Sequence, residues 1–253
     1  MGFDFMVLIV HISDLHLSHS DFNENMFLKA VDEINDLNPD MIILTGDLTD
    51  HGYYSEFLQI KDFLKMFNSS LFAIPGNHDA KNIGYKTFEE LIGDRSWKLT
   101  KDDENLVMLG LDSTTPDLSQ GNIGRLQQAW MENELNNCMV DNKFSIVAMH
   151  HHIIPIPGTG RERNILTDAG DILQSLISHE VDIVIGGHKH VPHLWQMDHT
   201  LFVNAGSLSS YKLRGKETNS YNIIQISENN IEIYLNKLDG NKILLGNFKR
   251  NVI

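Results

Sequence analysis

The stretch MIILTGDLTD, residues 41–50, decides the fold, because an apolar run rich in isoleucine ends in small, polar and acidic residues. An amphipathic segment at 23–37 comes before it, with apolar residues at helical spacing, followed by a turn at 38–40. Another apolar run, VLIVHI at 7–12, precedes that segment. The order strand, helix, strand predicts a βαβ unit with parallel strands.

The same alternation continues along the chain and then changes. Further amphipathic segments predict helices at 54–67, 125–137 and 168–179, and apolar runs predict strands at 71–76, 106–112, 144–150 and 181–187. From 193 onward only strand-like runs follow, which we expect to be antiparallel, at 193–197, 200–206, 221–227, 231–238 and 242–248. The pattern predicts a layered α/β sandwich whose later strands finish a second sheet.

Length and composition favour one domain of 1–253, with a motif core at 6–206 and antiparallel strands at 207–253 completing the second sheet. The 253 residues can bury a substantial core, and no linker-like stretch divides them. No apolar run has the length of a membrane span, and the run at 6–12 lacks the flanks of a signal peptide. We therefore expect a cytoplasmic protein without a membrane partner.

Charge and cysteine content exclude other classes. The formal net charge of −14, without any basic run, disfavours stable binding to a long nucleic acid. Cys138 is the only cysteine, so neither an internal disulfide nor a cysteine-based zinc site can form.

Ligand-type side chains follow five of the apolar runs. The motifs are SDLH at 13–16, GDLTD at 46–50, GNHD at 76–79, HHH at 150–152 and GHKH at 187–190. The carboxyl ends of strands in open α/β sheets converge on one crevice. One such motif occurs easily by chance, but five at successive strand ends do not. The residues expected to meet are Asp14, His16, Asp47, Asn77, His78, His150, His188 and His190.

These ligands offer nitrogen and oxygen without sulfur, which suits Mn, Fe, Zn or Co. They are too many for one tetrahedral zinc. They fit two metal ions that share a carboxylate at a separation of roughly 3.5–4 Å and bind a bridging hydroxide for phosphoryl displacement. The sequence thus predicts a two-metal hydrolase.

The motifs also carry a family resemblance. Asp14-Leu15-His16, the GDLTD and GNHD motifs, His150 and the GHKH motif resemble, in this order, the signature of the calcineurin-like metallophosphoesterases across 11–190. The chain is most similar to the class III cyclic-nucleotide phosphodiesterase branch. The resemblance implies an αββα sandwich in which two mixed β-sheets are flanked by helices.

The resemblance also implies a ligand set with Asp47 as the bridge. One metal would be held by Asp14, His16, Asp47 and His190, and the other by Asp47, Asn77, His150 and His188. The fourth motif of the branch usually reads His-His-Pro-Pro, whereas His152 and Ile153 stand here in place of the prolines. This departure affects the expected substrate rather than the metals.

Strand alternation divides the histidine triplet. It places His150 and His152 on one face and His151 on the other. The resemblance selects His150 as the ligand. His151 is then expected to support a ligand or to pack, and His152 is either a substrate-side residue or a merely solvated ring.

His78 and Asp50 are the expected catalytic pair. His78 lies one residue past Asn77, and we expect it to protonate or stabilise the leaving oxygen. Asp50 resembles the family carboxylate that orients this histidine, with a helix N-cap ahead of Tyr54 as the alternative. Asp79 is expected to be a turn or cap residue.

The loop PIPGTGRERN at 155–164 leaves the strand that supplies His150. Its prolines and glycines predict a shaped loop over the metals. Arg161 and Arg163 are candidates for binding a phosphoryl group, with pairing to Glu162 and other surface carboxylates as the alternative.

Three functions share these motifs. The first is a phosphodiesterase for small substrates, with 3',5'-cyclic nucleotides as the leading guess from the resemblance. The second is a nuclease acting on DNA or RNA, and the third is a non-catalytic interaction module of the same fold. The intact ligands and His78 argue for chemistry. The oligomeric state is open, with a homodimer among the expected forms.

Overall fold

The computed structural model describes residues 6–160 and 163–250. Its strands are β1 Met6–Ile12, β2 Met41–Thr45, β3 Leu71–Ile74, β4 Trp97–Lys101, β5 Leu106–Leu111, β6 Phe144–Met149, β7 Ile183–Gly186, β8 His193–Met197, β9 Thr200–Asn204, β10 Ser220–Ser227, β11 Asn230–Lys237 and β12 Lys242–Lys249. Its helices are α1 Glu24–Leu37, α2 Tyr54–Leu64, the short 3-10 helix Lys81–Ile83, α3 Gly84–Leu91, α4 Gly124–Val140 and α5 Ala169–Ser178.

The strands form two six-stranded sheets, and both are mixed. The first has the order β12-β11-β10-β1-β2-β3, in which β1 is parallel to β2 and antiparallel to β10. The second has the order β4-β5-β6-β7-β9-β8, with β5, β6, β7 and β9 parallel and the two edge strands antiparallel. The expected fold class is therefore confirmed.

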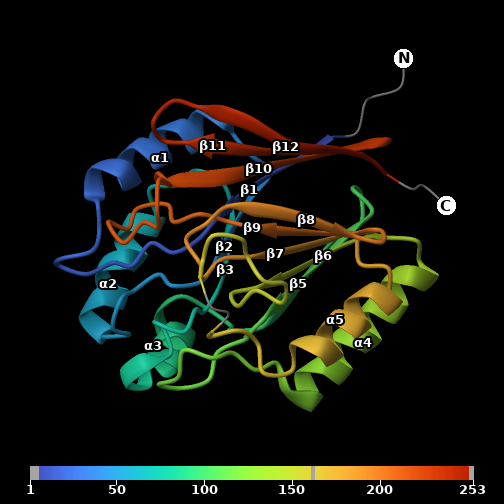
Figure 1. The fold of residues 1–253 in the computed structure, drawn as a ribbon, viewed down its shortest axis with the longest axis horizontal. Helices are drawn as coiled ribbons and strands as arrows, with labels where there is room; N and C mark the ends of the chain where they lie inside the picture. The colour runs from blue at the N-terminus through green and yellow to red at the C-terminus, as the bar shows by residue number, and fades with distance from the viewer. Residues whose placement is uncertain (1–5, 161–162, 251–253) are drawn as a thin grey trace.

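Three apolar cores hold the layers together. The central core lies between the sheets and takes Ile9, Met41 and Ile43 from one side and residues such as Ile146 and Ile185 from the other. The outer cores pack α1, α2 and α3 on the first sheet and α4 and α5 on the second. Figure 1 shows these two helix groups on opposite sides of the strands. The molecule is thus a helix, sheet, sheet, helix sandwich.

Local chemistry explains the first helix. Phe27, Ala30 and Ile34 of α1 recur at helical spacing and are fully buried in the outer core. The side chain of Asn23 caps the helix by accepting a hydrogen bond from the Met26 amide.

Several elements differ from the sequence prediction. β9 pairs antiparallel with β8 as expected, but on its other side it pairs in parallel with the buried strand β7, which was not expected. The elements α3 and β4 and the 3-10 helix were not predicted. The strands of 207–253 extend the sheet that holds β1.

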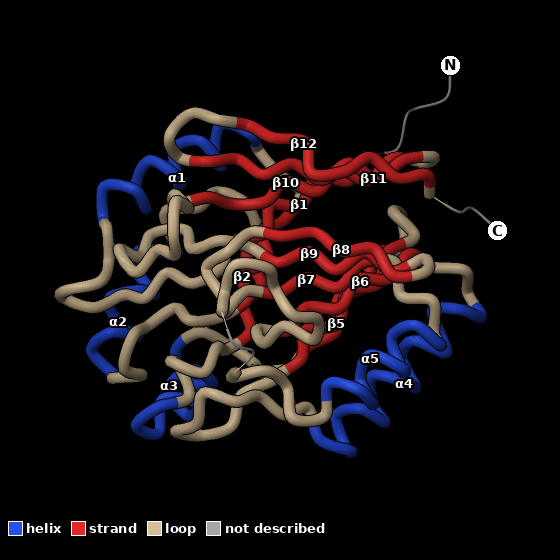
Figure 2. Tube along the Cα trace, viewed as in Figure 1, coloured by secondary structure: helices blue, strands red, loops and turns tan. Residues whose placement is uncertain are grey.

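The carboxyl ends of the parallel strands define one end of the molecule. Figure 2 shows most loops there, away from the two chain termini. None of the helices in the described ranges has the length and apolarity needed to cross a lipid bilayer.

Candidate metal centre

The candidate residues lie directly after the parallel strands. Asp14 and His16 follow β1, Asp47 follows β2, and the remaining ones follow β3, β6 and β7. Backbone hydrogen bonds join these loops, because the Asp14 amide donates to the Gly46 carbonyl at 3.0 Å and the His16 amide to the Asp47 carbonyl at 2.9 Å. The strand ends therefore hold one continuous set of loops.

Five candidate ligands adopt a left-handed backbone. The φ angles are 56° at Asp14, 52° at His16, 53° at Asp47, 74° at His188 and 55° at His190. A side-chain-bearing residue in this region costs on the order of 1–3 kcal/mol, and such residues gather at functional sites. The fold thus maintains local strain where the ligand-type side chains converge.

Gly76 and Gly187 permit this convergence. A Cβ on Gly76 would overlap Oδ1 of Asp47, and a Cβ on Gly187 would overlap the side chain of Ser13. Both motif glycines are needed because a carboxylate-bearing loop passes against their backbone.

The first cluster of ligand atoms joins β1 to β7. Nε2 of His16 lies 2.9 Å from Nε2 of His190. Oδ1 of Asp14 lies 3.3 Å from Nε2 of His190 and 3.8 Å from Nε2 of His16. These three side chains form a group with the spacing of a metal site.

The second cluster joins β3, β6 and β7. Oδ1 of Asn77 lies 3.2 Å from Nε2 of His150 and 2.9 Å from Nδ1 of His188. The two ring nitrogens are 3.2 Å apart. His150 and His188 also form a metal-like group with Asp47.

Asp47 lies between the clusters. Its Oδ2 is 3.5 Å from Nε2 of His16 and 3.4 Å from Nε2 of His150. Its Oδ1 accepts a hydrogen bond of 2.8 Å from the His78 amide, which fixes the carboxylate plane. One oxygen of Asp47 thus faces both groups.

Three histidines have partners that set their tautomers. Nδ1 of His16 contacts Oδ1 of Asp50 at 3.1 Å, Nδ1 of His150 contacts the Thr45 carbonyl at 2.7 Å, and Nδ1 of His190 contacts the Lys212 carbonyl at 2.5 Å. Ionised carboxylates and carbonyls only accept, so each Nδ1 donates. In the neutral ring each Nε2 then offers a lone pair to the cluster, as metal-binding histidines do.

The electrostatics favour positive charge in both clusters. Burial alone would lower the pKa of His16, but the neighbouring carboxylates of Asp14 and Asp50 raise it to about 10. Burial alone would likewise lower the pKa of His150, but the charge of Asp47 raises it to about 9. A metal ion would replace these protons.

The carboxylates of Asp14 and Asp47 are also suited to binding metal ions. Burial alone would raise the pKa of Asp14, yet His190 and His16 hold it well below its usual value, and His150 has the same effect on Asp47. Oδ1 of Asp14 is buried and accepts no hydrogen bond from the described residues. An ionised oxygen without a donor is suited to a cation, so the residues fit two metal ions.

His78 and Asp50 are in contact beside the clusters. Nδ1 of His78 lies 2.8 Å from the carbonyl and 2.9 Å from Oδ1 of Asp50. The His78 side chain is 24% exposed, so a substrate can reach it. The alternative role for Asp50 is wrong, because the N-cap of α2 is Tyr53.

Sequence reasoning missed two cations next to this pair. Nζ of Lys81 lies 2.9 Å from Nδ1 of His78, and Nζ of Lys212 donates to Asp50 Oδ2 at 3.1 Å. No motif marks either lysine.

Asp79 is a buried loop residue, in keeping with the expected turn role. Its carboxylate accepts from the amides of Leu48, Thr49 and Gly76 and so ties the GDLTD loop to the GNHD loop. Burial and the charge of Asp47 raise its pKa to about 6.

The other two triplet histidines face different surroundings. Nδ1 of His151 lies 2.8 Å from Ser113 Oγ, and burial together with His150 lowers its pKa to about 3. His152 is 5% exposed and stacks on the His188 ring with centroids 5.7 Å apart. The expectation of a merely solvated His152 ring is therefore wrong.

The loop after the triplet is tied to the site by Lys189, between two candidate ligands. Its Nζ donates to the Arg163 carbonyl at 2.8 Å. The Arg163 residue is exposed, whereas Arg161 and Glu162 lie outside the described residues. The loop therefore leaves Arg163 accessible beside the strand ends.

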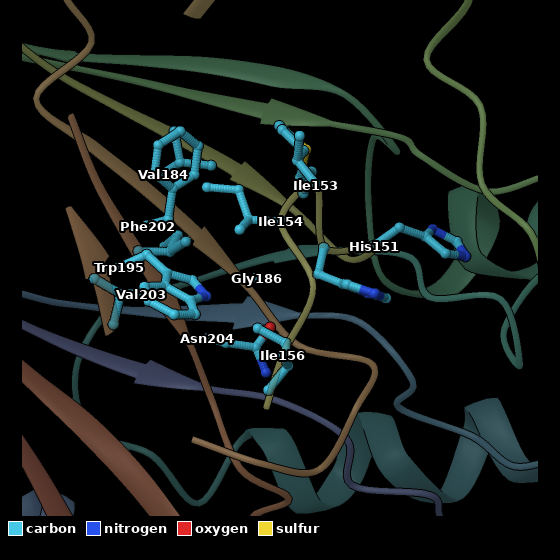
Figure 3. Close-up of a pocket in the computed structure, with 13 residues that line it drawn as sticks. His151, Ile153, Ile154, Ile156, Val184, Gly186, Trp195, Phe202, Val203 and Asn204 are labelled. Carbon is cyan, nitrogen blue, oxygen red and sulfur yellow. The ribbon is translucent and has the colours of Figure 1, made fainter. Parts of the chain in front are cut away.

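An apolar cavity lies behind this loop (Figure 3). Ile153, Ile156, Trp195 and Phe202 help to line it, and the His151 side chain points away from them. Its volume of about 30 Å³ suffices for a water molecule and not for a substrate. This cavity is therefore not the substrate site.

Among curated proteins, those similar in sequence to this chain include proteins named as phosphodiesterases. A probable glycerophosphodiester phosphodiesterase from Arcobacter nitrofigilis is 30% identical over 165 residues, which span 59% of each protein. A 3',5'-cyclic-nucleotide phosphodiesterase from Nostoc sp. is 22% identical over 222 residues, 84% of this chain and 82% of that protein.

Solved structures show the same fold at low sequence identity. A dimetal phosphatase from Danio rerio has a TM-score of 0.74 at 12% identity and covers 94% of this chain and 98% of its own. A purple acid phosphatase from yellow lupin has a TM-score of 0.76 at 14% identity, covering 96% and 53%.

The sequence model described as Calcineurin-like phosphoesterase matches residues 7–192, which include every candidate ligand. The resemblance seen in the sequence is thereby confirmed. Because the match spans well over half of the chain, the protein belongs to the calcineurin-like phosphoesterase family and is a metal-dependent phosphoester hydrolase.

Proposed function

We propose that the protein is a dinuclear-metal phosphodiesterase for small anionic diesters, with 3',5'-cyclic nucleotides as the first candidates. The observation that carries the proposal is the position of Asp47 Oδ2 between two groups of ligand atoms. One metal is assigned to Asp14, His16, Asp47 and His190. The other is assigned to Asp47, Asn77, His150 and His188.

The protein side chains have separate tasks. Two bound metal ions would polarise the phosphoryl oxygens and lower the pKa of the attacking water. His78 donates a proton to the leaving oxygen or stabilises its charge, since it is exposed beside Asp47. Asp50 contacts Nδ1 of His78, so Nε2 is left to face the substrate.

The substrate class follows from charge and from the relatives. A formal net charge of −14 disfavours long nucleic acids, and Arg163 offers one exposed cation within the loop that Lys189 holds. We assign Arg163, and with it Arg161 and His152, to substrate binding. The matched relatives bear the names of cyclic-nucleotide and glycerophosphodiester phosphodiesterases.

The decisive experiment compares substrates on manganese-loaded protein. We expect bis(p-nitrophenyl) phosphate and cyclic nucleotides to be hydrolysed faster than p-nitrophenyl phosphate or single-stranded DNA. Activity should disappear with a strong chelator and return when manganese is added. Far better cleavage of single-stranded DNA would favour a nuclease, and metal-independent activity would remove the two-metal assignment.

A further inference from the structure

A segment beyond the family match, buried over its first four residues, contacts the proposed metal centre. Residues 207–212, SLSSYK, lie in the connection between β9 and β10, and we call them the serine segment. Ser207, Leu208, Ser209 and Ser210 are all fully buried, which is unusual for a connection rich in hydroxyl groups. Each buried hydroxyl needs a partner, and the partners show what the segment does.

The serine segment binds the backbone of the loop after β1. Ser207 Oγ donates to the Asp14 carbonyl at 2.6 Å, the Leu208 amide to the Ser13 carbonyl at 3.0 Å, and Ser209 Oγ to the Leu15 carbonyl at 3.2 Å. Three consecutive carbonyls are thus held from one side. This contact supports the left-handed turn that aims Asp14 and His16.

Lys212 at the end of the serine segment makes two kinds of contact. Its carbonyl accepts the Nδ1 proton of His190 at 2.5 Å. Its ammonium donates to both oxygens of Asp50, at 3.2 and 3.1 Å, and lies 3.0 Å from Oδ2 of Asp21. The same residue therefore reaches a candidate ligand and the carboxylate beside His78.

Asp50 is the point through which the Lys212 ammonium acts. Its Oδ1 is shared by Nδ1 of His16 at 3.1 Å and Nδ1 of His78 at 2.9 Å. A carboxylate shared by several donors can rotate toward any of them. The Lys212 ammonium contacts both oxygens at once, and this restricts that rotation.

We propose that Lys212 is a positioning residue that fixes Asp50 through its ammonium group, and so aligns His16 for its metal and His78 for the leaving oxygen. The catalytic half of this inference rests on the proposed function. The metal-binding half does not require that any particular ester be the substrate.

Because the Lys212 side chain is partly exposed, a substitution there can test positioning with little effect on folding. Its side chain is 47% exposed, so replacing it removes little buried surface. Partly exposed ion pairs contribute little to stability, and the backbone carbonyl that binds His190 stays in place. A change at Lys212 should therefore alter chemistry and metal retention more than the melting temperature.

The test compares Lys212→Met with Lys216→Met, which removes an exposed lysine from the same connection. Positioning losses are typically about 10–100-fold in activity or metal affinity. We expect Lys212→Met to lower kcat for bis(p-nitrophenyl) phosphate by that factor, with KM within about two-fold. One of two manganese ions should also dissociate more readily in a chelator competition. Lys216→Met should match the wild type, and Lys212→Arg should recover part of the loss.

Lys212 contacts the carboxylates of both Asp50 and Asp21, and Asp21→Asn tests whether the second contact matters. It should behave like the wild type, because the contact with Asp50 remains. The proposal is overturned if Lys212→Met has wild-type kcat and metal retention, or if Asp21→Asn reproduces its defects with an equal fall in melting temperature. If the wild type hydrolyses no diester, the proposed function fails, and the chelator competition alone still decides the metal-binding half.

Discussion

Asp47 is the residue on which the two-metal proposal depends. Replacing it with asparagine keeps the shape and removes the charge that faces His16 and His150. A neutral amide bridges two cations poorly, so we expect Asp47→Asn to lose metal. Elemental analysis after manganese loading measures the result directly.

His78 should behave in the opposite way. We expect His78→Ala to reduce kcat by about 10²–10⁴ while both metals stay bound, as for loss of a general acid. His16, Asp47 and His78 also have the spacing of a metal site, so the alternative is that His78 is itself a metal ligand. An empty site in His78→Ala, or full metal content in Asp47→Asn, would mean that the two roles are wrongly assigned.

The sequence predicted where the ligand-type residues meet, because each follows an apolar run whose carboxyl end is fixed by the parallel strands. It could not show the left-handed backbone of His16, His188 and His190. A positive φ is uncommon for residues other than glycine, and although histidine adopts it more often than most, its identity alone does not predict it. Lys212 was also missed, since its contact with Asp50 joins positions 162 residues apart.

At the scale of elements, the three histidines that follow β6 are expected to have different roles. His150→Ala should lose the second metal, because its Nε2 faces Asn77 and Asp47. His151→Ala should act mainly on stability, since the ring is buried against Ser113. His152→Ala should keep both metals, although its ring stacks on His188. Metal analysis and thermal unfolding separate the three, and equal metal loss in all of them would contradict the division.

The elements that the sequence revealed are those with a regular apolar pattern. The helix α1 is one example, with its buried residues at helical spacing. In α3, by contrast, only Gly84 and Phe88 are buried, and its eight residues are fewer than the window over which a helical period can be recognised. The strand β4 is an edge without fully buried residues. The parallel pairing of β9 depends on its neighbour β7, which no local pattern identifies.

At the scale of the whole molecule, Asp182, which directly precedes β7 at the end of the strand opposite the metal centre, links stability to pH. Burial raises the pKa of Asp182 to about 6, against the hydrogen bond from the Ser145 amide and the charge of Arg250. Between about pH 4 and 6 the folded protein keeps this proton and the unfolded chain releases it. The free energy of unfolding therefore falls as pH rises through this window.

Asp182→Asn should remove this pH dependence, because an amide does not ionise. Its oxygen can still accept the hydrogen bond from the Ser145 amide. Relative to the wild type, its free energy of unfolding should increase by about 1–3 kcal/mol between pH 4 and pH 7. Urea unfolding with a chelator present excludes metal effects, and Asp103→Asn, at an exposed turn, is the matched control. An unchanged difference across the window would show that Asp182 ionises normally in the folded state.

The pairing of β1 with β10 dictates when the centre can be completed during protein synthesis. β1 can pair early with β2, but Met6 pairs on its other side with Ser227, so the second neighbour, β10, is available only after more than 200 further residues have been made. At ordinary translation speeds that delay is roughly 10–40 s. The serine segment that holds Asp14 also emerges late. A nascent chain therefore carries Asp14 and His16 before the segment that supports their loop has been made.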